Sequence, residues 1–136
     1  MTKTYVLDSS AALDFLEAGP GVRRVTQLLK DAIEQRNVIL MSVTHLGEVY
    51  YHVWPEHGQE AARRAVNQLL LMSVQPVSVD MDQALKAAEI KSRHKIPYVD
   101  CLAAALALLR KAILVTGDRD FEKLGRQADI LWINKG

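Results

Sequence analysis

The sequence predicts an α/β protein in which a short central parallel sheet lies between two layers of helices, a three-layer α/β/α sandwich. Short β-favouring runs alternate with longer helical segments along the chain, as in sheets built from strand–helix–strand units. Several of the helical segments repeat their apolar residues with the 3.6-residue helical period. The 136 residues suffice for one domain with a buried core, so we expect a single domain over 1–136.

The first strand is predicted at residues 4–7, where β-favouring side chains follow the N-terminus. Ser9 and Ser10 are expected to cap a helix that runs to Glu17. That helix should stop at the Gly19-Pro20-Gly21 turn.

Apolar periodicity predicts further helices at 22–35 and 59–72, each with charged residues on its opposite face. Between them, residues 38–41 form a predicted second strand. Ser42 is expected to cap a helix over 43–54, which the following proline should end.

Residues 74–79 are extended but contain Pro76, which favours an edge strand or a linker. Asp80 and Gln83 have the spacing of a capping box and should open a helix that ends near His94.

The C-terminal part begins with a strongly apolar helix predicted at 98–110. A strand at 113–116, a turn at 117–119, one helical turn at 121–124 and a last strand at 130–133 complete the prediction.

Composition excludes several classes of protein. The net charge is only +1, so there is no global electrostatic reason to expect nucleic-acid binding. The lone cysteine, Cys101, cannot form an internal disulfide, which favours a reducing cytoplasm. The longest apolar run, 101–109, is far short of the roughly 20 residues that span a bilayer. We therefore expect a cytoplasmic protein that does not enter a membrane.

Four acids stand in apolar surroundings: Asp8, Glu48, Asp100 and Asp118. Carboxylates among core-forming residues are costly unless a positive charge compensates them. Asp8 directly follows the first predicted strand and Asp118 closely follows the strand at 113–116, so both should lie at the carboxyl edge of the sheet, where ligands bind.

A divalent cation is the simplest compensation for such a cluster. Mg²⁺ prefers oxygen ligands and is commonly bound through a few carboxylates and substrate phosphates. Ser10 and Thr116, each two residues from one of the acids, are placed to orient a carboxylate. The pattern therefore indicates metal-dependent hydrolysis of phosphate esters.

Four segments together resemble the PIN-domain nucleases, and the chain's small size resembles the VapC toxins within that group. The segments are Val6-Leu7-Asp8-Ser9-Ser10-Ala11, Leu46-Gly47-Glu48-Val49, Tyr98-Val99-Asp100-Cys101-Leu102-Ala103-Ala104-Ala105 and Leu114-Val115-Thr116-Gly117-Asp118-Arg119-Asp120-Phe121. The resemblance runs from residue 4 to residue 133.

The resemblance implies a PIN-like fold and an endoribonuclease that depends on Mg²⁺ or Mn²⁺. It also implies a homodimer and inhibition by a cognate antitoxin protein that reaches into the acidic site. By the motif match, Asp8, Glu48, Asp100 and Asp118 correspond to the acidic quartet, Ser10 to its small hydroxyl residue, and Asp120 to a second acid of the last motif.

Two other functions stay open at the level of sequence. A phosphatase of the haloacid-dehalogenase type also has an aspartate after its first strand, but it needs a second aspartate where this chain has Ser10. A non-catalytic PIN-like binding module would keep the fold for protein contacts alone. Cleavage of RNA with and without EDTA separates these from a nuclease.

The basic residues and the histidines are less informative about function. Among the cations, Arg119 is the best candidate for contacting a substrate phosphate, because it lies between two candidate acids. His45, His52 and His57 lack the spacing of a zinc site and are interpreted as ordinary polar histidines.

Overall fold

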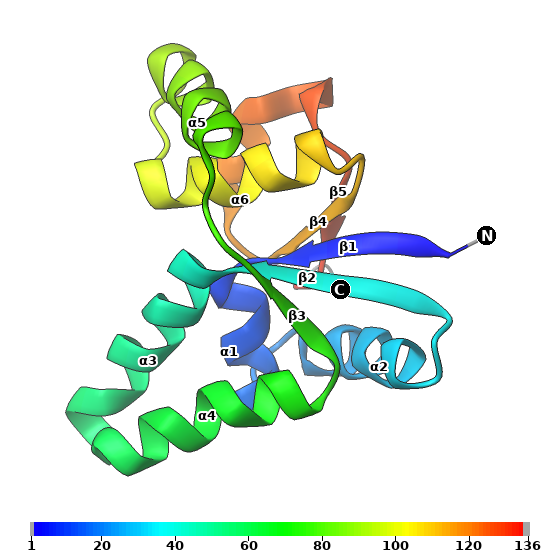
Figure 1. The fold of residues 1–136 in the computed structure, drawn as a ribbon, viewed down its shortest axis with the longest axis vertical. Coiled ribbons are helices and arrows are strands. Elements are labelled where there is room, and N and C mark those ends of the chain that lie inside the picture. Colours follow the sequence, from blue (N-terminus) through cyan, green and yellow to red (C-terminus); the bar gives the residue numbers. More distant parts are fainter. Residues whose placement is uncertain (1, 135–136) are drawn as a thin grey trace.

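Residues 2–134 are described in the computed structural model of the chain, and they form a five-stranded sheet with helices on both faces (Figure 1). The strands are β1 (Lys3–Leu7), β2 (Asn37–Ser42), β3 (Val74–Val77), β4 (Ile113–Thr116) and β5 (Ile130–Trp132). All neighbouring strands are parallel and their order is β3-β2-β1-β4-β5. The predicted α/β/α sandwich with a central parallel sheet is confirmed.

The helices occupy two separate layers. They are α1 (Ser9–Glu17), α2 (Val22–Ile33), α3 (Val43–His57), α4 (Gln59–Leu71), α5 (Met81–Arg93), α6 (Tyr98–Leu109) and the 3-10 helix η1 (Arg119–Gln127). Figure 1 shows α1 to α4 on one side of the sheet and α5 and α6 on the other. The chain changes side between β3 and β4, when it crosses from one edge of the sheet to the other half.

Alternating side chains of the central strands fill the two cores. Val6 of β1 pairs with Leu40 and Leu114 on the neighbouring strands, and all three are buried in the core beneath α5 and α6. Leu7 pairs with Val115, and both are buried in the core beneath α1 to α4. Because successive residues of a strand point to opposite faces, a sheet covered on both sides reads as continuously apolar runs.

This strand order places a topological switch between β1 and β4. β1 leads towards β2 on one side, whereas β4 leads towards β5 on the other. In parallel sheets the connections that leave two such strands run in opposite directions. A crevice that receives ligands commonly forms outside their carboxyl ends. Asp8 directly follows β1, and Asp118 lies two residues beyond the end of β4.

Several element boundaries differ from those predicted. Ser9 and Ser10 are the first helical residues of α1, and its N-cap is Asp8, whose Oδ1 accepts a hydrogen bond from the Ala11 N–H at 2.9 Å. The prediction that the serines cap this helix was wrong. The carboxylate of Asp8 therefore caps α1 at the carboxyl edge of the sheet.

Helix α3 continues past the predicted stop at Trp54 and includes Pro55, less than one turn before its end at His57. A proline at this place removes one backbone donor and crowds the preceding turn, yet α3 continues through it for two more residues. Helix α2 ends at Ile33, earlier than predicted, and Gln35 just beyond it has a left-handed φ of 63°.

The segment after β4 is more helical than predicted. η1 covers nine residues in place of a turn and one helical turn, with a kink at Gly125, where φ is 59°. The last strand ends at Trp132, one residue earlier than predicted. The extended segment with Pro76 forms the edge strand β3, which was one of the two predicted alternatives.

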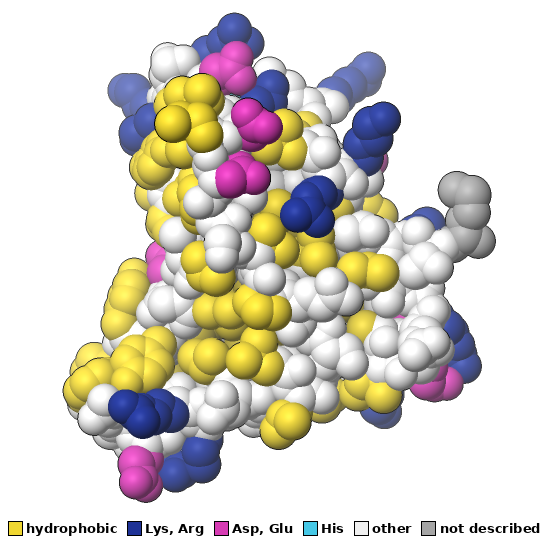
Figure 2. All heavy atoms as spheres, viewed as in Figure 1, with side chains coloured by type: hydrophobic (Ala, Val, Ile, Leu, Met, Phe, Trp, Pro, Cys, Tyr) yellow, Lys and Arg dark blue, Asp and Glu magenta, His cyan; other side chains and the backbone are white. Residues whose placement is uncertain are grey.

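Large hydrophobic side chains are exposed on several helices: Ile33, Val43, Tyr51, Trp54, Leu70, Leu71, Met81, Leu85, Tyr98 and Leu109. Figure 2 shows hydrophobic side chains gathered over the α3–α4 pair and beside β3 on the face viewed. Patches of this kind typically mark protein contacts. Within residues 2–134, no helix combines the length and apolarity needed to cross a bilayer.

Candidate metal centre

The candidate site lies at the carboxyl edge of the sheet and draws its acids from four separate places in the chain. Asp8 follows β1, Glu48 lies within α3, Asp100 lies in the first turn of α6 and Asp118 precedes η1. Asp8, Asp100 and Asp118 stand at helix starts, where the partial positive charge of the helix dipole favours a carboxylate.

Asp8 is almost fully buried, with 2% of its surface exposed. Its Oδ1 accepts hydrogen bonds from Ser10 Oγ at 2.7 Å and from the Ala11 N–H, and its Oδ2 accepts one from Thr116 Oγ1. Burial raises the pKa of this carboxyl above its usual range, against the lowering effect of the hydrogen bonds from Thr116, Ala11 and Ser10. A carboxylate offers about four lone-pair sites, so these three bonds leave one for a cation.

The hydroxyl of Thr116 connects Asp8 to Asp118. Thr116 Oγ1 accepts a hydrogen bond from the Asp118 N–H at 2.9 Å while it donates to Asp8. Ser10 Oγ lies 3.3 Å from Thr116 Oγ1 and accepts from the Gly117 N–H at 3.0 Å. Ser10 and Thr116 therefore tie the end of β4 to the start of α1, and both donate to the Asp8 carboxylate.

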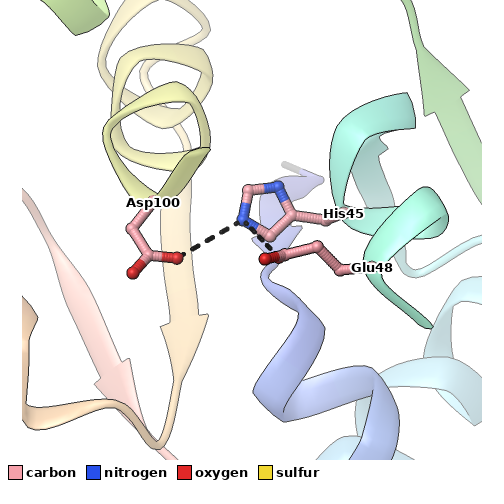
Figure 3. Close-up of side chains that lie close together, drawn as sticks. All are labelled: His45, Glu48 and Asp100. Carbon is pink, nitrogen blue, oxygen red and sulfur yellow. Dashed lines mark ion pairs between the residues drawn. The ribbon is translucent and has the colours of Figure 1, made fainter. Parts of the chain in front are cut away.

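The carboxylates of Glu48 and Asp100 point toward each other, with the ring of His45 between them (Figure 3). His45 Nε2 lies 3.6 Å from Glu48 Oε1 and 3.8 Å from Asp100 Oδ1. Glu48 is held by Ser9 Oγ, which donates to its Oε1 at 2.9 Å, and by the Tyr51 hydroxyl, which donates to its Oε2 at 3.3 Å. The ligand atoms of His45, Glu48 and Asp100 all lie within 4.8 Å of one another.

Asp100 also belongs to a second group of oxygens. Its carboxylate and those of Asp118 and Asp120 present one oxygen each within 4.8 Å of one another. Asp118 caps η1 by accepting from the Asp120 N–H at 2.9 Å. The shared aspartate makes the two groups adjacent, and such sites are suited to divalent cations, which gather carboxylate oxygens.

The structure therefore brings together four of the five predicted acidic ligands in two groups. Neither of these two groups, as found among residues 2–134, includes Asp8. Asp8 is instead linked to them indirectly, through Thr116 and the backbone of Asp118.

Arg119, the predicted phosphate contact, directly follows Asp118 in the chain and has a half-exposed side chain. Its guanidinium stacks 4.4 Å from the centroid of the Trp132 ring and pairs with Glu122 at 3.8 Å. Its Nη2 donates to Asn134 Oδ1 at 3.4 Å. These contacts hold the side chain in place while part of the cation stays accessible to a ligand.

His45 differs from the ordinary polar histidine that the sequence predicts. His52 and His57 are exposed and pair with nearby glutamates, as expected of such histidines. His45 instead has no exposed surface, and its Nε2 has no hydrogen-bond partner. The sequence contains one signal for the role of His45. It lies three residues before Glu48 on the same helix, which puts both side chains on one helix face.

The fold and the site together define a parallel α/β domain that has two carboxylate-rich groups at the switch point of its sheet. The model of the PIN domain family matches residues 5–127, and the chain belongs to this family. The predicted resemblance is confirmed, and membership supports a nuclease-type function.

Solved structures with the same fold include toxin–antitoxin proteins. The chain is similar to the structure of VapBC2 from Rickettsia felis bound to a promoter DNA fragment, with a TM-score of 0.76, 18% identity and coverage of 94% of this chain and 97% of that one. VapBC-1 from nontypeable Haemophilus influenzae matches with a TM-score of 0.73, 18% identity and coverage of 97% and 99%.

A third match is VapC20 from Mycobacterium tuberculosis, a toxin that cleaves the sarcin-ricin loop. Its TM-score is 0.70 at 22% identity, with coverage of 89% of this chain and 95% of that one. The comparison with curated proteins found no match.

Proposed function

We propose that this chain is a divalent-metal-dependent endoribonuclease, a single nuclease domain over residues 1–136 that acts as the toxin of a toxin–antitoxin pair. The observation that carries the proposal is the position of Asp100, whose carboxylate belongs to both groups of candidate ligands. Membership of the PIN domain family supports nuclease chemistry at this site.

The residues present fit a hard divalent cation. Oxygen donors come from Glu48, Asp100, Asp118 and Asp120, and Asp8 has one lone-pair site not used by its hydrogen bonds. Mg²⁺ or Mn²⁺ is proposed as the cofactor, because carboxylate oxygens suit both ions. Bound there, the cation would polarise the scissile phosphate and favour ionisation of the attacking water.

The chain's own residues position these groups. Thr116 and Ser10 fix the Asp8 carboxylate and the start of η1, while Ser9 and Tyr51 fix the Glu48 carboxylate. Ligands held in this way lose little conformational freedom when the substrate arrives. Arg119, held on Trp132, is proposed to contact a substrate phosphate.

RNA is proposed as the substrate, and similarity to toxin–antitoxin structures supports a protein inhibitor. Two of those structures contain VapBC proteins, and VapC20 is a toxin that cleaves the sarcin-ricin loop. We therefore propose a cognate antitoxin as partner, a homodimeric state and a cytoplasmic location. The exposed hydrophobic side chains on α3 to α6 provide surface for such contacts.

Phosphatase chemistry of the haloacid-dehalogenase type is disfavoured by the surroundings of Asp8. A nucleophilic aspartate must be open to substrate, whereas this carboxylate is 2% exposed and caps α1. The position that would hold the second aspartate is Ser10, whose hydroxyl donates to Asp8.

The test is cleavage of total cellular RNA by the purified full chain, followed by mapping of the new 5′ ends. We expect Mg²⁺ or Mn²⁺ to support cleavage and EDTA to stop it. Asp100→Asn should abolish cleavage, whereas Asp82→Asn, an acid exposed on α5 outside both groups, should leave it unchanged. Equal cleavage by wild type and Asp100→Asn, or full activity in EDTA, would contradict the proposal.

A further inference from the structure

The unpaired ring nitrogen of His45 is unusual for a fully buried polar atom. Among the described residues, only a few buried side-chain nitrogen or oxygen atoms lack a hydrogen-bond partner, and His45 Nε2 is one of them. Leaving such a group unpaired costs on the order of 1 to 3 kcal/mol. A group that remains unpaired at a functional site commonly serves a ligand that completes its bonding.

The direction of this nitrogen identifies that ligand. Figure 3 shows the ring edge aimed into the space between Glu48 and Asp100, and dashed lines join Nε2 to one oxygen of each. The two groups nearest to Nε2 are carboxylates, which accept hydrogen bonds but donate none when ionised. One imidazole nitrogen and two carboxylate oxygens converging on a point can form the donor set of a cation.

The other ring nitrogen is held in the way that ligating histidines require. His45 Nδ1 lies 3.3 Å from Thr44 Oγ1, which in turn lies 2.8 Å from Ser42 Oγ. When Nδ1–H donates to the Thr44 hydroxyl, the lone pair of the unprotonated ring is on Nε2. An outer hydrogen bond of this kind orients metal-ligating histidines and fixes their tautomer.

We infer that His45 Nε2 is itself a ligand of the bound cation, together with Glu48 and Asp100. This inference rests on the proposed metal-dependent function and adds a nitrogen donor to a site otherwise made of oxygens. Metal–ligand bonds of about 2.1 Å set adjacent octahedral ligands about 3.0 Å apart. The observed 3.6 and 3.8 Å separations therefore need only a small inward movement of the side chains.

A nitrogen donor changes which ions the site prefers. Imidazole binds first-row transition metals well, whereas Mg²⁺ selects oxygen and gives up its water reluctantly. The group formed by Asp100, Asp118 and Asp120 contains oxygen donors alone. His45 therefore biases its own group towards Mn²⁺ and related ions over Mg²⁺.

The first experiment uses the wild-type chain loaded with Mn²⁺ and examined by pulsed electron paramagnetic resonance. We expect ¹⁴N modulation from a directly bound imidazole. The signal should disappear in His45→Asn and persist in His52→Asn, which changes an exposed histidine of the same helix.

Calorimetry on the same proteins measures the preference between ions. In His45→Asn the Kd for Mn²⁺ should rise at least about tenfold, since a lost ligand should cost no less than a lost outer partner. The Kd for Mg²⁺ should change by less than about threefold, because the asparagine amide offers an oxygen that Mg²⁺ accepts. His52→Asn should match the wild type for both ions.

The outcomes separate this inference from the proposed function. Mn²⁺ binding without ¹⁴N modulation in the wild type overturns the role of His45 and leaves a metal-dependent nuclease. Tighter Mn²⁺ binding by His45→Asn also overturns it, because a histidine that merely neutralises Glu48 and Asp100 would compete with the ion. No binding of either ion by the wild type overturns both.

Discussion

The hydroxyl of Thr116, the last residue of β4, donates a hydrogen bond to the carboxylate of Asp8, the residue that follows β1 and lies 108 positions earlier. The two strands are neighbours at the switch point of the sheet. Because the same hydroxyl also accepts from the Asp118 N–H, one side chain sets the spacing between the first and last acidic motifs. Metal sites depend on supporting contacts of this kind.

Replacing Thr116 by valine keeps its shape and removes the hydroxyl. Asp8 Oδ2 and the Asp118 N–H each lose a partner, so we expect a loss of about 1.5 to 3 kcal/mol in the free energy of unfolding. Cleavage should fall about 10- to 100-fold. Urea denaturation and RNA cleavage assays measure the two effects, and Thr116→Ser is the control, because it retains the hydroxyl and should stay near wild type.

Asp8→Asn should stabilise the metal-free protein at neutral pH. Burial raises the pKa of Asp8 in the folded chain, so the folded state keeps this proton to a higher pH than the unfolded state does. Wild-type stability should therefore fall as pH rises from near the ordinary pKa of 3.8 through the raised pKa of the folded state, and the loss persists above it. Asparagine cannot ionise, and the stability of the variant should not show this fall.

Denaturation in EDTA across acidic to neutral pH tests this prediction. The advantage of Asp8→Asn should be small at the lowest pH and should grow and then level off as pH rises. A constant difference between Asp8→Asn and wild type would contradict the burial argument.

Divalent ions should raise the melting temperature of the wild-type chain. A ligand at 100 times its Kd adds about 2.7 kcal/mol to the stability of the state that binds it. Asp100→Asn should lose most of this gain, because Asp100 contributes to both groups of ligands, whereas Asp120→Asn should lose less, since it contributes to one. Thermal unfolding in EDTA and in MgCl₂ or MnCl₂ measures the shift, and equal shifts in all three proteins would rule out this site.

The sequence predicts the elements and most of the site because both leave local signals. Runs such as Val6-Leu7 and Leu114-Val115 are apolar on both faces, which indicates strands inside a parallel sheet. Asp8 and Asp118 closely follow those strands, so the sequence alone places them at the carboxyl edge of the sheet.

The features that the sequence did not predict depend on contacts between distant segments. His45 Nε2 lies 3.8 Å from Asp100 of α6, and nothing in the local sequence of α3 indicates that contact. The capping of α1 by Asp8 also competes with two adjacent serines that have similar capping propensity. The end of α3 beyond Pro55 also differs from the prediction, because a proline can distort a helix locally without ending it.

Two glycines in opposite surroundings, Gly21 packed against Ile133 and Gly47 open to solvent, test the local packing of the fold. A Cβ at Gly21 would lie 2.6 to 2.7 Å from side-chain atoms of Ile133, including its Cβ, which cannot move freely. Gly21→Ala should therefore cost about 1 to 3 kcal/mol. Gly47→Ala, in α3 with no neighbouring atom within 4 Å, should stabilise by about 0.5 to 1 kcal/mol. Urea denaturation compares the two variants, and a stabilised Gly21→Ala would contradict the packing around Ile133.

Arg119 should matter for binding the substrate more than for the chemical step. Its guanidinium is held on Trp132 beside the site, with about half of the side chain exposed. A contact with one phosphate is independent of sequence, so Arg119→Ala should raise KM for every RNA tested while kcat changes little. The salt dependence of binding should become shallower by about one unit of slope.

The matched control for Arg119 is Arg23→Ala, which removes an equal charge from an exposed position on α2. If the arginine acts through a local phosphate contact, only the Arg119 variant changes the slope of log Kd against log salt concentration. Equal effects of both variants would assign the loss to net charge alone. Stacking on Trp132 contributes only about 0.5 to 1 kcal/mol to the stability of the fold at an exposed site. The Arg119 variant should therefore remain folded at the assay temperature.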